Sequence, residues 1–162
     1  MCSRSCSNWP NLLIVVASLW KREIVAIYKI IMSQSLCRGI LALDESIRFA
    51  AIANGLGKLI AEDYRANLDP LMTKEETAQY AIQAVTRAAM REDFTSKLGP
   101  FQYSVGKYAK LTRAVIPIDA VIPIDDLKEQ TYLLLSLDVN SDAVGIIENK
   151  IIKFLKDTLQ TK

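Results

Sequence analysis

Histidine is absent from this 162-residue chain, and cysteine, proline and glycine are scarce, with three, five and six residues. Without histidine the chain lacks the commonest general base and the commonest metal ligand. No catalytic, cofactor-binding or metal-binding motif stands out, so we predict a protein that is not an enzyme and holds no cofactor. Three cysteines, an odd number, argue against a disulfide framework and indicate a reducing, cytoplasmic compartment.

Charge of one sign is also lacking, because the net charge is only +2. The basic residues do not gather into one run, and sequence-independent nucleic-acid binding needs several phosphate contacts, so nucleic acid is not an expected partner. The composition is 51% hydrophobic and 23% charged, which is typical of a globular protein and too apolar for disorder. A chain of this length is expected to bury a core as one domain.

Two apolar runs, Leu12–Trp20 and Ile24–Ile31, set the N-terminus apart from the rest of the chain. Neither run reaches the roughly 20 residues of a membrane-spanning helix. Joined, they would place Lys21, Arg22 and Glu23 near the middle of a bilayer, which is costly. A secretory signal fits somewhat better, because Arg4 precedes the apolar part, but no small-x-small cleavage site follows cleanly.

Met32 opens a segment that reads smoothly into the domain, and we interpret it as a candidate start of the native chain. The predicted division is therefore an N-terminal extension, 1–31, and a domain, 32–162. Within the extension, Ile24, Ile27, Tyr28 and Ile31 share one helical face and could pack against the domain or a partner. Membrane contact, if any, is expected only through residues 12–31.

From residue 32 the pattern alternates between helix and strand signals. Gln34–Leu43 has helical apolar spacing. Ile47–Ala53 and Lys58–Tyr64 read as two strands joined by an Asn-Gly turn, a strong hairpin signal because both turn residues tolerate positive φ.

A long helix over Lys74–Lys97 is the element around which the rest is expected to be organised. Thr73 and Glu76 form a capping-box signature at its start. Apolar residues follow at three-and-four spacing, and the face is mostly alanine, so that another element can approach closely. Its members are Ala78, Ala81, Ile82, Val85, Ala88, Ala89 and, further on, Phe94.

Strand signals return after Gly99 and Pro100. Phe101–Tyr108 alternates, with Phe101, Tyr103 and Val105 expected on one side, and Leu111–Ile118 follows as a strand. The hexapeptide AVIPID occurs at 114–119 and again at 120–125. Two prolines six residues apart cannot both lie inside a ladder, so one copy is expected beyond the strand end.

Tyr132–Val139 is the most strand-like run and is expected to be central, and Asp142–Leu159 has the pattern of an amphipathic last helix. The resulting order is α-β-β-α-β-β-β-α. Antiparallel hairpins with helices covering one face predict an α+β fold, a two-layer sandwich with a five-stranded antiparallel sheet.

The stretches IRFAAIANGLGKLIAEDY, QYAIQAVTRAA, FQYSVGKYAKLTRAVIPI and LLLSLDV, within about 34–159, resemble the roadblock family. This family includes dynein light chains and bacterial and archaeal regulators of small GTPases. The likeness is closer still to uncharacterised small archaeal proteins with a TKEE–QYA–V–R helix. The duplicated AVIPID lies where the family has a tight turn, and the N-terminal extension has no counterpart.

The resemblance implies a non-enzymatic homodimer that engages a protein partner, with a small Ras-like GTPase as one such partner. Family members join sheets edge to edge and pack their long helices together, which implies pairing through Phe101–Tyr108 beside the Ala81–Ala88 face. An edge-to-edge pair would also hide an otherwise exposed ladder. The implied dimer or partner interface comprises Ala81, Ala84, Val85, Ala88, Arg87, Arg91, Phe101, Tyr103, Val105 and Tyr108.

Some of these residues have other interpretations. Arg87 and Arg91, one turn apart, suit a partner-binding face or a solvated stripe. Tyr80, Tyr103 and Tyr108 suit a ligand pocket, core packing or a dimer contact. Two other functions therefore stay open: a sensor domain with a small-molecule pocket, and an adaptor tethered to a membrane by residues 12–31.

Overall fold

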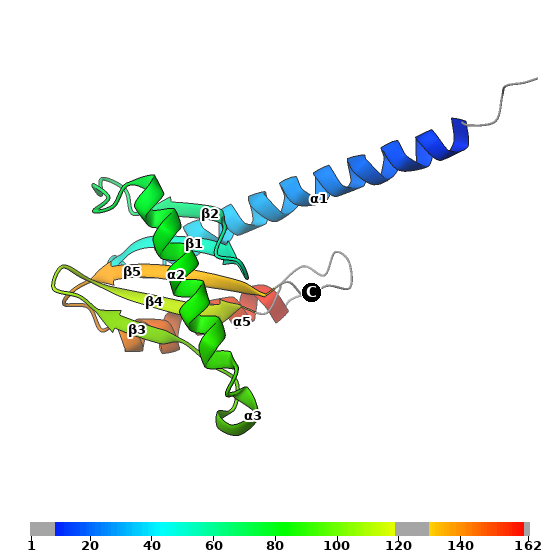
Figure 1. Cartoon of the computed structure of the whole chain (residues 1–162). Coiled ribbons are helices and arrows are strands. Elements are labelled where there is room, and N and C mark those ends of the chain that lie inside the picture. The colour runs from blue at the N-terminus through cyan, green and yellow to red at the C-terminus, as the bar shows by residue number, and fades with distance from the viewer. Residues whose placement is uncertain (1–8, 119–129, 161–162) are drawn as a thin grey trace, which may run out of the picture.

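A computed structural model describes residues 9–118 and 130–160 of the chain. Five strands form one sheet in the order β2-β1-β5-β4-β3, and all neighbours are antiparallel (Figure 1). The predicted α+β fold with a five-stranded antiparallel sheet is confirmed. The strands are β1 Ile47–Asn54, β2 Leu59–Tyr64, β3 Ser104–Lys107, β4 Leu111–Ile118 and β5 Thr131–Asp138.

The central strand is β5, as its sequence predicts, and all of its residues except Asp138 are buried. Leu133 and Leu135 join the core on one face of the sheet, whereas Tyr132 and Leu134 join the core on the other. Because the strand is apolar on both faces, both faces have to be covered from water.

Helices accordingly lie on both faces of the sheet, which corrects the expectation of two layers. We call the side covered by α2 (Lys74–Glu92) the α2 face. The opposite face is covered by the end of α1 (Trp9–Leu41) and by a C-terminal helical run. This run is α4 (Ala143–Ile146), a π-helical turn (Ile147–Ile151) and α5 (Ile152–Gln160).

The first helix is much longer than the expected Gln34–Leu43, because α1 begins at Trp9. It passes Met32 without interruption, so the predicted boundary between extension and domain does not coincide with a helix end; the division itself stays a prediction. The sequence has no glycine or proline between Pro10 and Gly39 that would break the helix. Among the residues described, no helix has the length and apolarity needed to span a bilayer.

Helix α2 begins with the predicted capping box. The Glu76 backbone N–H donates to Thr73 Oγ1 (3.2 Å), and the Thr73 N–H donates to Glu76 Oε2 (2.8 Å). The helix ends at Glu92, earlier than Lys97, and a single turn, α3 (Thr95–Leu98), follows before Gly99.

The turn between β1 and β2 lies directly against α2. Gly57 has φ +79°, and a Cβ added there would lie 2.4 Å from the Ile82 Cα. Alanine spacing on α2 and a glycine in the turn together allow the two backbones to approach this closely.

Strand β3 is shorter than the predicted Phe101–Tyr108. Phe101 packs with the core on the α2 face and Tyr103 with the core on the opposite face, so the expected common side is wrong. The reason is that residues 101–103 precede the ladder, where the period-two alternation of a strand does not apply.

Pro117 of the first AVIPID copy lies within β4, opposite Tyr132. Strand β3 pairs with β4 only as far as Val115. No described strand therefore needs a hydrogen bond from the backbone nitrogen of Pro117, which has no N–H to donate. The second copy, 120–125, lies outside the described residues.

Candidate protein-interaction surface

Strand β3 is an edge of the sheet with one open side, because β4 is its only neighbour among the described strands. The Tyr108 N–H donates to the Leu111 carbonyl (2.9 Å), which closes the β3–β4 hairpin. Hydrogen-bonded and non-hydrogen-bonded pairs alternate from that point. Val105 and Lys107 therefore direct their backbone N–H and C=O groups outward.

The other edge of the sheet, β2, is covered by α1. The Gln34 side-chain amide donates to the Glu62 carbonyl (3.1 Å), and Arg38 forms an ion pair with Asp63 (3.4 Å). A helix laid along an edge protects it from pairing with another strand. The two edges thus differ, because α1 packs along β2, whereas among the described strands only β4 pairs with β3.

Aromatic and cationic side chains connect α2 to the β3–β4 hairpin. The Arg91 guanidinium lies 5.8 Å from the centroid of the Phe101 ring, and that of Arg113 lies 3.7 Å from the centroid of Tyr80. The Arg113 Nη2 also approaches Met72 Sδ at 2.7 Å. Burial raises the pKa of Tyr80, so its hydroxyl stays neutral at physiological pH. These contacts hold α2 and the hairpin as one surface.

Four of the expected interface residues are part of the core. Ala81, Ala84, Val85 and Ala88 are buried on the α2 face, packed toward the sheet of the same chain. Their side chains therefore cannot meet a second subunit, and this part of the expected interface needs correction. The alanine stripe serves close packing within the chain, because a sheet is the surface it covers.

The other six expected residues lie at or near the surface. Arg87, Arg91, Val105 and Tyr108 are exposed, and Phe101 is half-buried beside Arg91. Tyr103 is half-buried on the opposite face, where its hydroxyl donates to Glu148 Oε1 (2.6 Å), a bond that raises the pKa of Tyr103. Their contact with a partner stays a prediction.

Bulky apolar residues on the outer side of α2 and just after it were not expected at the surface. Ile82 and Phe94 were predicted to pack with the alanines, but both are exposed. They join Met90 and Leu98 as large apolar side chains in contact with solvent. Successive residues of an α-helix are about 100° apart around its axis, so Ile82 points about 100° away from the buried Ala81. This angular offset is the sequence signal from which the exposure of Ile82 could have been predicted.

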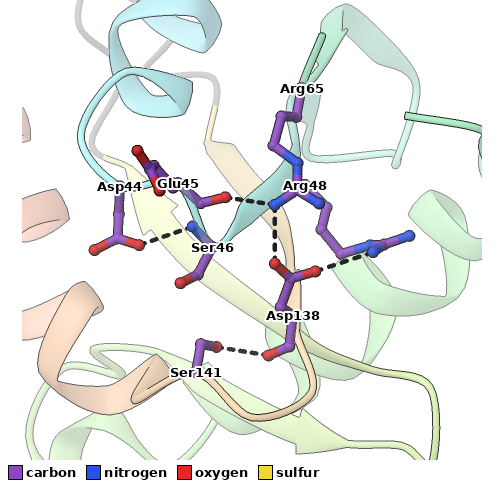
Figure 2. A network of polar contacts seen from close by, with 7 residues as sticks. All are labelled: Asp44, Glu45, Ser46, Arg48, Arg65, Asp138 and Ser141. Atoms are coloured by element: carbon purple, nitrogen blue, oxygen red, sulfur yellow. Dashed lines mark hydrogen bonds and ion pairs between the residues drawn. The ribbon is translucent and has the colours of Figure 1, made fainter. Parts of the chain in front are cut away.

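A network of polar contacts is centred on Asp138 (Figure 2). Its carboxylate accepts from Arg65 Nη1 (2.8 Å) and Arg48 Nη1 (3.0 Å), while Ser141 Oγ donates to its carbonyl (2.7 Å). Arg65 also donates to the Glu45 carbonyl. Arg65 first, and then Arg48, lowers the pKa of Asp138. The cluster joins β1, the end of β2 and β5, and each oxygen of the Asp138 carboxylate accepts from one arginine.

A second tie connects the end of α1 to the C-terminal helical run. Lys150 Nζ lies 2.8 Å from Asp44 Oδ2, and the Ser46 N–H donates to Asp44 Oδ1 (2.8 Å). The hydrogen bond from Lys150 is the main cause that lowers the pKa of Asp44 to about 2. In both polar clusters the carboxylate is bonded to basic side chains of the same chain. This arrangement indicates a structural role rather than a reactive site.

The described residues contain no group of three or more metal-ligating side chains. A depression between the sheet and the connector before α2, bordered by Arg48, Met72, Thr77 and Arg113, has a volume of about 30 Å³. That is space for about one water molecule, far less than an organic ligand needs. The depression gives the small-molecule sensor interpretation no support.

Comparison with family models and with curated proteins gives no match to this chain. Among solved structures, the gliding protein MglB from Thermus thermophilus is similar, with TM-score 0.58, 15% identity, and coverage of 78% of this chain and 84% of that one. An MglB structure with a tetrameric arrangement has TM-score 0.59, 16% identity, and coverage of 79% and 85%. A Roadblock/LC7 domain from Streptomyces avermitilis has TM-score 0.52, 15% identity, and coverage of 79% and 98%. This chain has the fold that these proteins share.

Proposed function

We propose that the chain is a roadblock-type, non-enzymatic protein-binding module of the cytoplasm that forms a homodimer and regulates a partner protein. The partner class that we propose is a small Ras-like GTPase, on the strength of the family resemblance and of the shared fold. The closer likeness to small archaeal proteins stays a prediction.

The open edge of β3 is the observation that carries the homodimer. Val105 and Lys107 direct unpaired backbone groups outward, and Val105 and Tyr108 add exposed apolar surface to the same hairpin. An isologous pair of such edges satisfies both ladders at once.

Exposed residues of α2 extend this surface. Arg87 and Arg91 lie on the side of α2 that faces Phe101 and β3, and Met90 and Phe94 lie next to them. Apolar side chains with arginines at their border are typical of protein interfaces. We therefore propose a dimer interface, called the seam below, along β3 and the outer side of α2. It excludes the four buried residues, Ala81, Ala84, Val85 and Ala88.

Proline at Val105 tests the seam. The outward N–H of Val105 has no partner within the described chain, so Val105→Pro should leave the β3–β4 hairpin intact while it removes one inter-subunit donor per chain. Light scattering across a dilution series should show dimers for the natural chain. For the variant we expect a dissociation constant raised about tenfold to a hundredfold.

Leu56→Arg is the matched control, because Leu56 is exposed in the β1–β2 turn, away from β3 in the strand order. It should dimerise like the natural chain. A natural chain that is monomeric at all concentrations, or a Val105→Pro variant with unchanged affinity, would contradict the proposed seam.

The GTPase assignment needs a separate measurement. Purified Ras-like GTPases from the same cell, loaded with GTP or GDP analogues, can be titrated with the full chain by calorimetry. We expect binding that depends on the bound nucleotide and that Arg87→Glu weakens. Dimers that bind none of these GTPases would retain the scaffold and refute the partner class.

A further inference from the structure

The longer part of α1 lies outside the packed body of the protein. Side chains that join α1 to the sheet come from its last turns, such as Gln34, Cys37 and Ile40. Before these turns the helix extends away from the sheet (Figure 1). We call residues 9–33 the projecting part of α1.

The projecting part carries large apolar side chains that are open to solvent. Ile24, Ile27 and Ile31 are 62%, 56% and 59% exposed, and Tyr28 and Ile30 are exposed as well. Contiguous apolar surface of this kind marks an interaction site, because monomeric soluble proteins rarely leave it in water.

The shape of this apolar face favours a broad surface over a single partner helix. At 100° per residue, the five residues from Ile24 to Ile31 named above span an arc of about 160°. A two-helix seam needs only the narrow stripe of Ile24, Ile27 and Ile31, with polar residues beside it. Here Tyr28 and Ile30 occupy those flanking positions.

Charge points in the same direction. The sequence places Lys21, Arg22 and Lys29 in this part of the helix against one acid, Glu23. The sequence thus gives this segment a net positive charge. Two copies of it would repel each other, whereas a surface of anionic phospholipid attracts a positively charged segment.

We propose that the projecting part of α1 binds the surface of an anionic phospholipid bilayer, with Ile24, Ile27 and Ile31 inserted at the interface. The helix lies in the plane of the membrane surface and does not cross it. Because α1 leaves the body beside β2 and the proposed seam is at β3, binding to lipid leaves the seam open.

Vesicle flotation with the full 162-residue chain tests this proposal. One set of vesicles contains only phosphatidylcholine, and the other contains about 30 mol% phosphatidylglycerol. We expect the chain to float with the anionic vesicles, and salt raised to about 0.5 M to weaken binding. Ile27→Asp and Ile31→Asp should each lower the partition coefficient about tenfold or more. Both positions are exposed, so the fold should be kept, and circular dichroism checks this.

Leu98→Asp is the matched control, since Leu98 is an exposed apolar residue outside α1, and its binding should be unchanged. Val105→Pro should still float with the anionic vesicles, since each chain keeps its own α1, and this separates the proposal from the dimer seam. Absence of flotation, or equal flotation of the Ile27→Asp variant, would overturn the proposal. So would a smaller oligomer for Ile27→Asp without any lipid binding by the natural chain, because a second copy would then be the occupant.

Discussion

Gly57 shows how much a single missing side chain contributes to this fold. Its φ of +79° disfavours any L side chain, and an added Cβ would also meet the Ile82 backbone. We expect Gly57→Ala to lower the free energy of unfolding by about 2 kcal/mol or more. Gly99→Ala is the comparison, because Gly99 has φ +82° but no atom within 4 Å of an added Cβ. Urea unfolding of both should show the larger loss at Gly57; equal losses would mean that the contact with α2 adds nothing.

Asp138 makes stability depend on pH in a known direction. Its folded-state pKa lies below the ordinary 3.8, chiefly because of Arg65 and then Arg48. The ion pairs therefore stabilise the fold fully above the unfolded-state pKa, and this contribution disappears as the pH falls through the folded-state pKa. The difference in free energy of unfolding between the natural chain and Asp138→Asn should be largest near neutral pH and should disappear in acid. The exposed Asp69→Asn serves as control, and an Asp138→Asn gap that ignores pH would refute the linkage.

Individual residues were predictable where their role is local. Thr73 and Glu76 lie at fixed spacing in a capping box, and the structure contains it. Ala81 and Ala88 of α2 were correctly assigned to a packed face, whereas Ala78 is exposed, and the surface that the buried alanines meet belongs to the same chain. Sequence spacing shows that a face is packed and cannot show against which subunit it packs.

At the scale of elements, the start of α2 depends on one side chain. Thr73→Ala removes the acceptor for the Glu76 N–H and should cost about 1 kcal/mol of unfolding free energy. Thr73→Ser keeps the hydroxyl and should stay within a few tenths of the natural value. Thermal unfolding of the two variants gives the comparison. An equal loss in both would show that the hydroxyl does not carry the cap.

Elements with strong periodic signals were predicted well. The β1–β2 hairpin, β4, β5 and the last helix lie where their patterns placed them. The exceptions have physical causes. Strand β3 is short because Phe101 and Tyr103 contact opposite layers, and α1 is long because no residue breaks it. The helix on each face follows from a central strand that is apolar on both sides, a tertiary fact that helix periodicity alone does not contain.

At the scale of the whole molecule, the packed body should fold without the projecting part of α1. The contacts of α1 with the sheet begin near Gln34, so a chain of residues 32–162 should keep its thermal midpoint within a few degrees. The same chain should lose vesicle binding, while light scattering should show the same number of copies per particle as for the full chain. A large loss of thermal stability would show that residues 1–31 belong to the folding unit, against the predicted division.

The side chain of Gln34, bonded to the Glu62 carbonyl, has a consequence for how large an assembly can grow. A sheet with two unpaired edge strands can add further copies of the chain at both edges and lengthen into a fibre. Here the chain's own helix packs along one edge. In the proposed dimer, growth by strand addition would therefore stop at two copies and would yield a finite particle instead of a polymer.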